Sequence, residues 1–156
     1  MSGYVIEGLD PARFRPLYGL DNEALAARGA IRMRSDSPVG YPCRVTLRDV
    51  APGADVLLLN HEHQPAATPY RSRHAIFVRE GAEEAARFEN AIPEQLAIRL
   101  LSVRAFDAND MMIDADVVDG GDLDGMIVRY FELEATSYLH VHNARRGCFA
   151  ARVNRL

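Results

Sequence analysis

Two regularly alternating stretches constrain the fold more than any other feature of this sequence. Residues 99–118 alternate apolar and polar side chains on either side of a polar tetrapeptide at 107–110, and residues 137–153 do so on either side of 144–147. A period of two is typical of half-buried strands, and both interruptions have the length and composition of hairpin loops. We therefore predict β-hairpins over residues 99–118 and 137–153.

One longer helix and a few short ones are predicted beside these hairpins. Apolar residues recur at helical spacing after two glycines, which predicts an amphipathic helix over residues 122–134 with Asp122 as its N-cap. Short helices are predicted over residues 20–29, 82–90 and 93–98, the first because Asp21 and Gly29 suit its two ends.

Further strands are predicted over residues 4–8, 30–34, 43–47, 55–60 and 74–79. The run over 55–60 is continuously apolar, which predicts a strand that is central in its sheet and covered on both faces. Strands outnumber helices, so the predicted class is α+β with a mostly antiparallel sheet. The stretch between the last two strands, residues 61–73, shows neither periodicity and is interpreted as a long functional loop.

Length and composition limit the function. A chain of 156 residues with 48% hydrophobic and 26% charged residues predicts one globular domain, residues 1–156. The net charge of -4 argues against nucleic acid and anionic membranes as partners. All 18 basic residues are arginine, which excludes lysine-dependent mechanisms such as a Schiff base or a Walker A site. No apolar run reaches signal-peptide or membrane-span length, so we expect a cytoplasmic protein with Cys43 and Cys148 as thiols.

Two arginine-rich segments contain candidate site residues. Cys43 and Arg44 follow a turn, and Tyr70, Arg71 and His74 lie at the end of the long loop. Guanidinium groups bind carboxylates and phosphates through paired hydrogen bonds, and a guanidinium beside a thiol can activate it as a nucleophile. Cys43 is therefore a candidate nucleophile, His74 a candidate general base, and the two arginines candidate anion clamps. A buried structural cysteine and a solvated loop are the alternatives.

The last hairpin supplies two further candidates. A period of two places His140 and His142 on one side of their strand and Leu139 and Val141 on the other. If the apolar pair faces the core, the histidines face either solvent or a groove covered by another segment. We interpret His140 as a second candidate general base and Asn143 as a binding residue.

A metal site is another interpretation of the histidines. His61 and His63 are two residues apart, as are His140 and His142, and His-x-His on a strand can present two nitrogens to one ion. The sequence lacks the Cys-x-x-Cys and His-Glu-x-x-His patterns, and no glutamate follows His63 at the spacing expected for a cupin-like site. The sequence therefore assigns no metal ligand and no cofactor.

Three blocks of the sequence resemble a known family. They are residues 40–44 with 47–49 and 52–53, residues 68–70 with 74–78, and residues 138–143 with 147–149. From Ala30 to Leu156 the chain resembles the bacterial family catalogued as domain of unknown function 1203. The resemblance implies a small bacterial domain and brings no established activity, cofactor or catalytic residue. Family members often have a second cysteine three residues after the first, where this chain has Thr46.

The leading hypothesis is a protein that binds a small anionic molecule in a cleft, with or without catalysis. The expected lining residues are Cys43, Arg44, Tyr70, Arg71, His74, His140 and Asn143. One alternative is a non-enzymatic module for protein interaction or homo-oligomerisation, in which the same loops form a subunit contact. The third is a metal-binding protein with His-x-His ligands.

Overall fold

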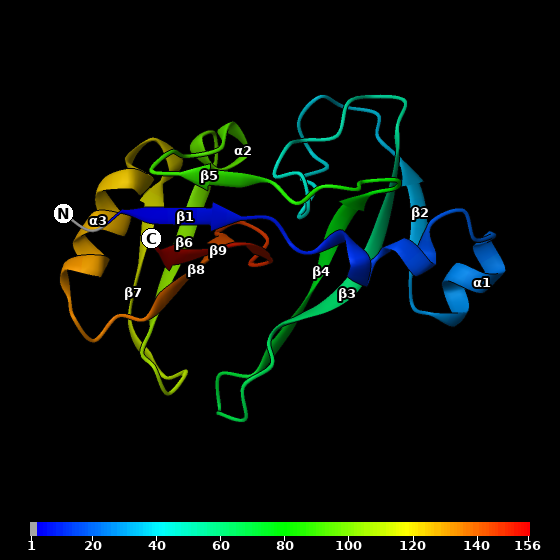
Figure 1. Cartoon of the computed structure of the whole chain (residues 1–156). Coiled ribbons are helices and arrows are strands. Elements are labelled where there is room, and N and C mark those ends of the chain that lie inside the picture. The colour runs from blue at the N-terminus through cyan, green and yellow to red at the C-terminus, as the bar shows by residue number, and fades with distance from the viewer. Residues whose placement is uncertain (1–2) are drawn as a thin grey trace.

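The computed structural model describes residues 3–156, which form two antiparallel sheets with short helices around them (Figure 1). The larger sheet has six strands in the order β5-β1-β9-β8-β6-β7. These strands are β1 (Tyr4–Glu7), β5 (Arg87–Glu89), β6 (Leu100–Phe106), β7 (Met112–Asp119), β8 (Tyr138–Asn143) and β9 (Phe149–Arg155). Both predicted hairpins, β6-β7 and β8-β9, are confirmed, and so is the α+β class.

The smaller sheet has three strands in the order β2-β3-β4. These strands are β2 (Ile31–Arg34), β3 (Asp55–Gln64) and β4 (Ser72–Arg79). The central position predicted for residues 55–60 is confirmed, because Val56 packs into an apolar cluster with Ile76 while Leu57 packs into another with Leu25. Burial of successive side chains requires cover on both faces, since they point to opposite sides of a strand.

The helix α3 (Leu123–Glu132) covers one face of the six-stranded sheet and follows the 3-10 turn η3 (Gly120–Asp122). The predicted apolar stripe is its buried side, formed by Leu123, Met126, Ile127, Tyr130 and Phe131. Asp122 stands at the N-cap position, but its side chain makes no capping hydrogen bond. Within residues 3–156, no helix combines the length and apolar character that crossing a membrane requires.

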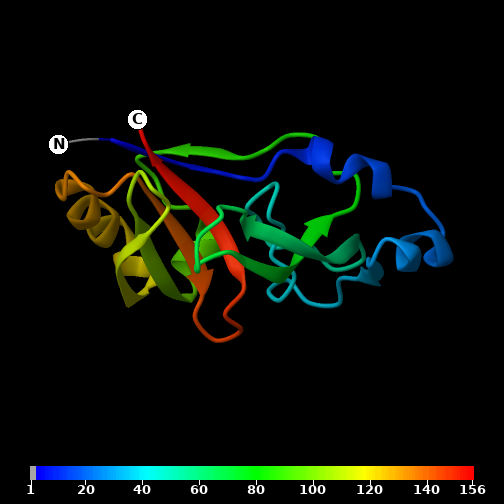
Figure 2. The same ribbon diagram turned by 90° about the horizontal axis from the view of Figure 1, so that it is seen from below.

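The remaining helices are short. They are η1 (Pro11–Arg13), η2 (Arg15–Leu17), α1 (Asn22–Ala27) and α2 (Glu94–Ala97). The predicted start of α1 is confirmed, because the Asp21 side chain accepts a hydrogen bond from the Ala24 backbone amide at 2.8 Å. In both views α1 and the smaller sheet lie at one end of the molecule and α3 at the other (Figure 1 and Figure 2).

The face of the six-stranded sheet opposite α3 is also covered. Leu139 and Val141 face the α3 side, and the two histidines lie on the other side of the strand, as the period of two predicted. His140 and His142 are buried as well, with exposed fractions of 2% and 0%. The far end of the β3-β4 hairpin packs against this second face, where Gln64 donates a hydrogen bond to the Tyr138 hydroxyl at 2.9 Å. The two sheets therefore enclose the histidine face of β8, and exposure to solvent is excluded.

The strand predicted over residues 43–47 is wrong. This segment forms turns between the two sheets, and Leu47 has a positive φ of 52°. Its backbone forms hydrogen bonds with three separate segments. The Arg44 amide donates to the Phe77 carbonyl, the Val45 carbonyl accepts from the Ala86 amide, and the Arg44 carbonyl accepts from the Leu9 amide. Buried backbone groups need partners, and here separate segments supply them in place of one neighbouring strand.

Two further predictions need correction. Residues 82–90 form no helix; the edge strand β5 lies there instead and pairs with β1, because the open edge of β1 outweighs the local helix preference of an Ala- and Glu-rich segment. The long loop predicted over 61–73 is shorter, since β3 continues to Gln64 and β4 begins at Ser72. A register shift between His61 and Gln64 breaks the alternation that would have revealed the strand.

Candidate functional site

A cleft of about 700 Å³ lies where the two sheets meet. We call it the sheet cleft, and it is lined by Gly40, Pro42, Arg44, Leu58, His74, Ala75, Phe77, Ala97, Ile98, Arg99, Leu100, Asp119, Gly120, Asn143, Arg145, Arg146 and Cys148. This volume is in the range of small-molecule sites, which span about 300–1,000 Å³. The lining combines apolar side chains from both sheets with several guanidinium groups.

The structure brings three of the seven predicted site residues to this cleft: Arg44, His74 and Asn143. The other four are not on its lining. They are Cys43, Tyr70, Arg71 and His140.

Arg44 is the most deeply buried charged residue of the cleft, with 1% of its surface exposed. Its guanidinium donates to the Phe149 carbonyl at 2.8 Å, the Pro42 carbonyl at 2.5 Å and the Cys148 Sγ at 3.1 Å. Burial lowers the pKa of Arg44 from its ordinary value, because the charged form loses hydration. These bonds tie the 43–47 turn to the β8-β9 turn and form the floor of the cleft.

Cys148 and Asn143 lie side by side beside Arg44. The Asn143 side-chain amide donates to Cys148 Sγ at 3.5 Å, and the Asn143 Oδ1 is buried with no hydrogen-bond partner among residues 3–156. Both cysteines are free thiols. A buried acceptor without a partner is uncommon in proteins and often marks a functional position.

The other arginines of the cleft differ in whether they are neutralised. Arg99 forms two hydrogen bonds with Asp49, at 2.6 and 3.0 Å, so its charge is compensated. Arg145 and Arg146 are exposed and have no ion pair within residues 3–156. Asp119 is the single carboxylate on the lining. The cleft therefore carries an excess of positive charge.

Cys43 belongs to the apolar core of the smaller sheet. It is fully buried, and its Sγ accepts hydrogen bonds from the backbone amides of Thr46 and Arg79 at 3.4 and 3.2 Å. Thr46 thus contributes a backbone contact to the sulfur. No ligand can reach this thiol while the core remains closed.

Tyr70 and Arg71 lie at the tip of the β3-β4 hairpin, away from the cleft. The Tyr70 ring packs edge-on against Phe106 with centroids 6.2 Å apart. Arg71 is exposed and forms an ion pair with Glu62 at 3.2 Å. This contact is a surface ion pair between the hairpin tip and β3.

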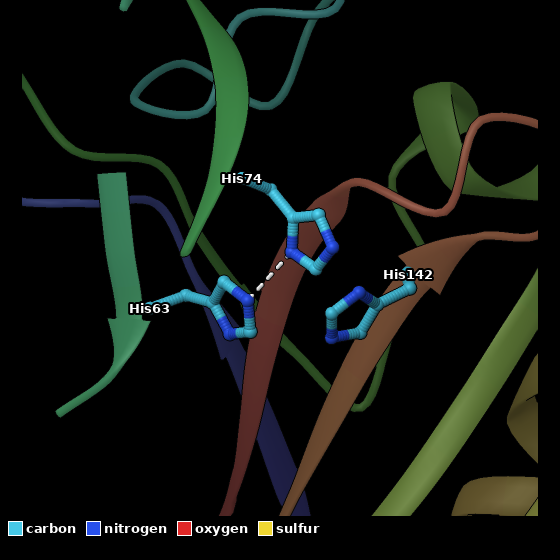
Figure 3. Close-up of side chains that lie close together, drawn as sticks. All are labelled: His63, His74 and His142. Atoms are coloured by element: carbon cyan, nitrogen blue, oxygen red, sulfur yellow. Dashed lines mark hydrogen bonds between the residues drawn. The ribbon is translucent and has the colours of Figure 1, made fainter. Parts of the chain in front are cut away.

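Three imidazoles lie close together next to the cleft: those of His63 on β3, His74 on β4 and His142 on β8 (Figure 3). We call them the histidine cluster. One ring nitrogen of each lies within 4.8 Å of the others. His63 Nε2 is 2.7 Å from His74 Nδ1, and their rings are stacked. The cluster and the cleft share His74, so they are adjacent.

His140 lies next to the cluster in a cage of aromatic rings. Its centroid is 5.0 Å from that of Phe106, 5.2 Å from that of Phe149 and 5.8 Å from that of His63. Burial lowers the pKa of His140 to about 2 and that of His142 to about 3, and it also lowers the pKa of His74. These imidazoles are therefore neutral near pH 7.

The cleft and the histidine cluster fall within a segment that identifies the family. Residues 40–155 match the family described as "Protein of unknown function (DUF1203)". The chain belongs to the DUF1203 family. The resemblance predicted from three sequence blocks is thereby confirmed. No curated protein and no solved structure matches this DUF1203 chain significantly.

Sequence reasoning missed several residues that the DUF1203 fold places at these sites. Cys148, Arg145 and Arg146 were visible as the turn of the last hairpin, but nothing in the sequence shows which segment the turn faces. His63 and His142 were visible as halves of two His-x-His pairs. The structure selects one histidine from each pair and adds His74, which no spacing rule connects to either.

Proposed function

We propose that the sheet cleft binds a small molecule with a carboxylate or phosphate group and an apolar body. The observation that carries this proposal is the charge imbalance of the cleft. Four arginines and one carboxylate line it, and within residues 3–156 only Arg99 among the arginines is neutralised by an ion pair, with Asp49. Arg145 and Arg146 have guanidinium groups available for an anion, and guanidinium groups suit carboxylate and phosphate geometry.

The apolar part of the cleft supports a ligand that is larger than an inorganic ion. Leu58, Phe77, Ile98 and Leu100 contribute apolar surface opposite the polar turn. A pocket with a mostly apolar wall and a few polar groups fixes the orientation of an amphipathic ligand. Asn143 adds a buried acceptor, its Oδ1, that could receive a hydrogen bond from a ligand hydroxyl or amide.

Calorimetric titration with hexanoate, phenyl phosphate and inorganic phosphate tests the proposal. We expect saturable binding of the first two and weaker binding of inorganic phosphate, which cannot use the apolar wall. At ten times the dissociation constant a ligand should stabilise the fold by about 1.4 kcal/mol, which raises the melting temperature by about 3–6 °C.

Arg145→Gln and Arg146→Gln are the diagnostic variants, because both side chains are exposed and their loss leaves the core intact. Arg28→Gln is the matched control, since Arg28 is an exposed arginine at the end of α1 and is not on the cleft lining. We expect each diagnostic variant to weaken binding about tenfold, as loss of one charged hydrogen-bonding group does, with the control unchanged. An equal loss in all three variants would contradict a defined site.

Light scattering on the same samples tests the non-enzymatic alternative. A stable oligomer that binds neither hexanoate nor phenyl phosphate, and that dissociates when Arg145 or Arg146 is replaced, would favour an interaction module over a binding cleft. A monomer that binds hexanoate or phenyl phosphate supports the cleft.

A further inference from the structure

We infer that His63, His74 and His142 form a binding site for one divalent transition-metal ion of the zinc type. The inference goes beyond the anion-binding cleft and does not depend on it. Within residues 3–156, this is the group of potential metal ligands that the fold brings together. The three side chains come from three strands and two sheets and point toward one another (Figure 3).

The distances are close to those of a three-histidine site. Zinc–nitrogen bonds of about 2.0–2.1 Å in tetrahedral geometry place two ligand nitrogens about 3.3 Å apart. His63 Nε2 and His74 Nδ1 are 2.7 Å apart, and the three ligand atoms lie within 4.8 Å of one another. To receive an ion, the first pair has to open by about 0.6 Å, and any pair near the 4.8 Å limit has to close.

The tautomer of His142 is fixed from behind by the backbone. His142 Nδ1 lies 3.0 Å from the Gly147 carbonyl oxygen, which only accepts hydrogen bonds, so Nδ1 carries the proton. The lone pair is then on Nε2. Metal-binding histidines commonly donate their second N–H to a carbonyl or carboxylate in this way.

His63 is also prepared for a ligand. Its ring is stacked on Phe149, with centroids 5.1 Å apart, and on His74, at 4.8 Å, so packing restricts its orientation. The ring nitrogen that faces His74 is Nε2, which is the one available to an ion; the other, Nδ1, is buried and has no hydrogen-bond partner among residues 3–156.

The donor set indicates the class of metal. Three imidazoles without a carboxylate or thiolate suit Zn²⁺, Ni²⁺, Cu²⁺ or Co²⁺, and they do not suit Mg²⁺ or Ca²⁺, which prefer oxygen ligands. Three protein ligands leave a fourth position open. Arg104 Nη1 lies 3.4 Å from His142 Nε2 and donates toward the lone pair that the ion would use, so the guanidinium has to move aside when the ion binds. Its charge then favours an anionic fourth ligand such as hydroxide or a carboxylate.

The site differs from a simple His-x-His site. His61 is two residues from His63, a spacing that places two side chains on the same face of a regular strand. Here, however, His61 lies outside the cluster. Its ring packs near those of Phe14 and Phe149, at centroid distances of 6.2 and 6.3 Å. The register shift between His61 and Gln64 separates the two histidines. His61 therefore provides a matched control on the same strand, with the same 9% exposure as His63.

Titration of chelator-treated protein with Zn²⁺ alone, followed by calorimetry, tests the inference. We expect one Zn²⁺ per chain, affinity weakened at least about tenfold in His63→Gln, His74→Gln and His142→Gln, and unchanged affinity in His61→Gln. Co²⁺ added alone should give the visible absorption of a tetrahedral nitrogen site, and His74→Gln should lose it.

His74→Gln keeps the test valid if the buried variants fail to fold, because His74 is only partly buried on β4. Circular dichroism confirms that each variant is folded before titration. Three results would overturn the inference: no saturable Zn²⁺ binding by the wild type, undiminished binding in folded His74→Gln, or a loss in His61→Gln equal to that in His63→Gln. Since no phosphate or carboxylate is present, these results are independent of the anion titrations.

Discussion

Replacing Gly120 with alanine should destabilise the protein, although Gly120 has no positive φ that would demand glycine. The reason is a close backbone approach at the edge of the sheet cleft. A Cβ built on Gly120 would lie 1.9 Å from the Leu96 carbonyl oxygen, whereas real Cβ contacts are essentially never shorter than 3.0 Å. The backbone at η3 and α2 must therefore separate by about 1 Å, since rigid backbone atoms cannot rotate away as a side chain can.

The cost follows from overpacking and from one lost hydrogen bond. Overpacking of a tight contact costs about 1–3 kcal/mol, and the Gly120 amide, which donates to the Arg99 carbonyl at 2.7 Å, contributes about 1 kcal/mol. We expect Gly120→Ala to lower the free energy of unfolding by about 3 kcal/mol, which lowers the melting temperature by about 6–12 °C.

Two neighbouring glycines provide matched controls. A Cβ on Gly121 or Gly125 meets no atom within 4 Å. Gly125 is exposed inside α3, where alanine is favoured over glycine by about 1 kcal/mol, so Gly125→Ala should raise the melting temperature by about 2–4 °C. Gly121→Ala should change it little. Thermal unfolding followed by circular dichroism measures all three, and a Gly120→Ala protein as stable as the wild type would refute the close-contact argument.

Two other predictions concern acid stability and thiol access. Arg32 donates two hydrogen bonds to Glu80, at 2.8 and 2.7 Å, and they hold the pKa of Glu80 below its usual range. A depressed carboxyl pKa stabilises the fold above the unfolded-state pKa and loses that effect as pH falls through the folded-state value. Glu80→Gln should therefore cost at most about 1 kcal/mol at pH 7, because solvent screens this pair, and less near pH 3. Urea unfolding at both pH values checks this, and a difference that does not change with pH would contradict it. Iodoacetamide should alkylate Cys148, which lines the cleft, in the native protein and reach the fully buried Cys43 only after unfolding, as mass spectrometry with a Cys148→Ser control would show.

Local patterns determined the elements that are regular over their whole length. The β6-β7 and β8-β9 hairpins alternate with a period of two, and α3 has an unbroken stripe at helical spacing, so each element was predictable. Patterns failed where a distant segment decides the conformation. β5 forms because β1 offers a free edge, and residues 43–47 stay irregular because three other segments bind their backbone.

The candidate site follows the same division. The sequence alone determined which reactive groups the chain has: arginine as the only basic residue besides histidine, two cysteines and two His-x-His pairs. It also predicted which residues of β8 share a face, because that depends only on a period of two. It also predicted Arg44, His74 and Asn143 as site residues, and the structure places all three on the cleft lining. The sequence did not show the surface that unites them.

The tertiary structure decided which of these groups meet. His63, His74 and His142 come together because a register shift in β3 redirects the strand end and because the β3-β4 hairpin packs on the second face of the larger sheet. The same packing turns Cys43 into the core and leaves Cys148 on the cleft beside Arg44. Contacts between residues far apart in the chain depend on how whole sheets pack, and no local spacing rule contains that information.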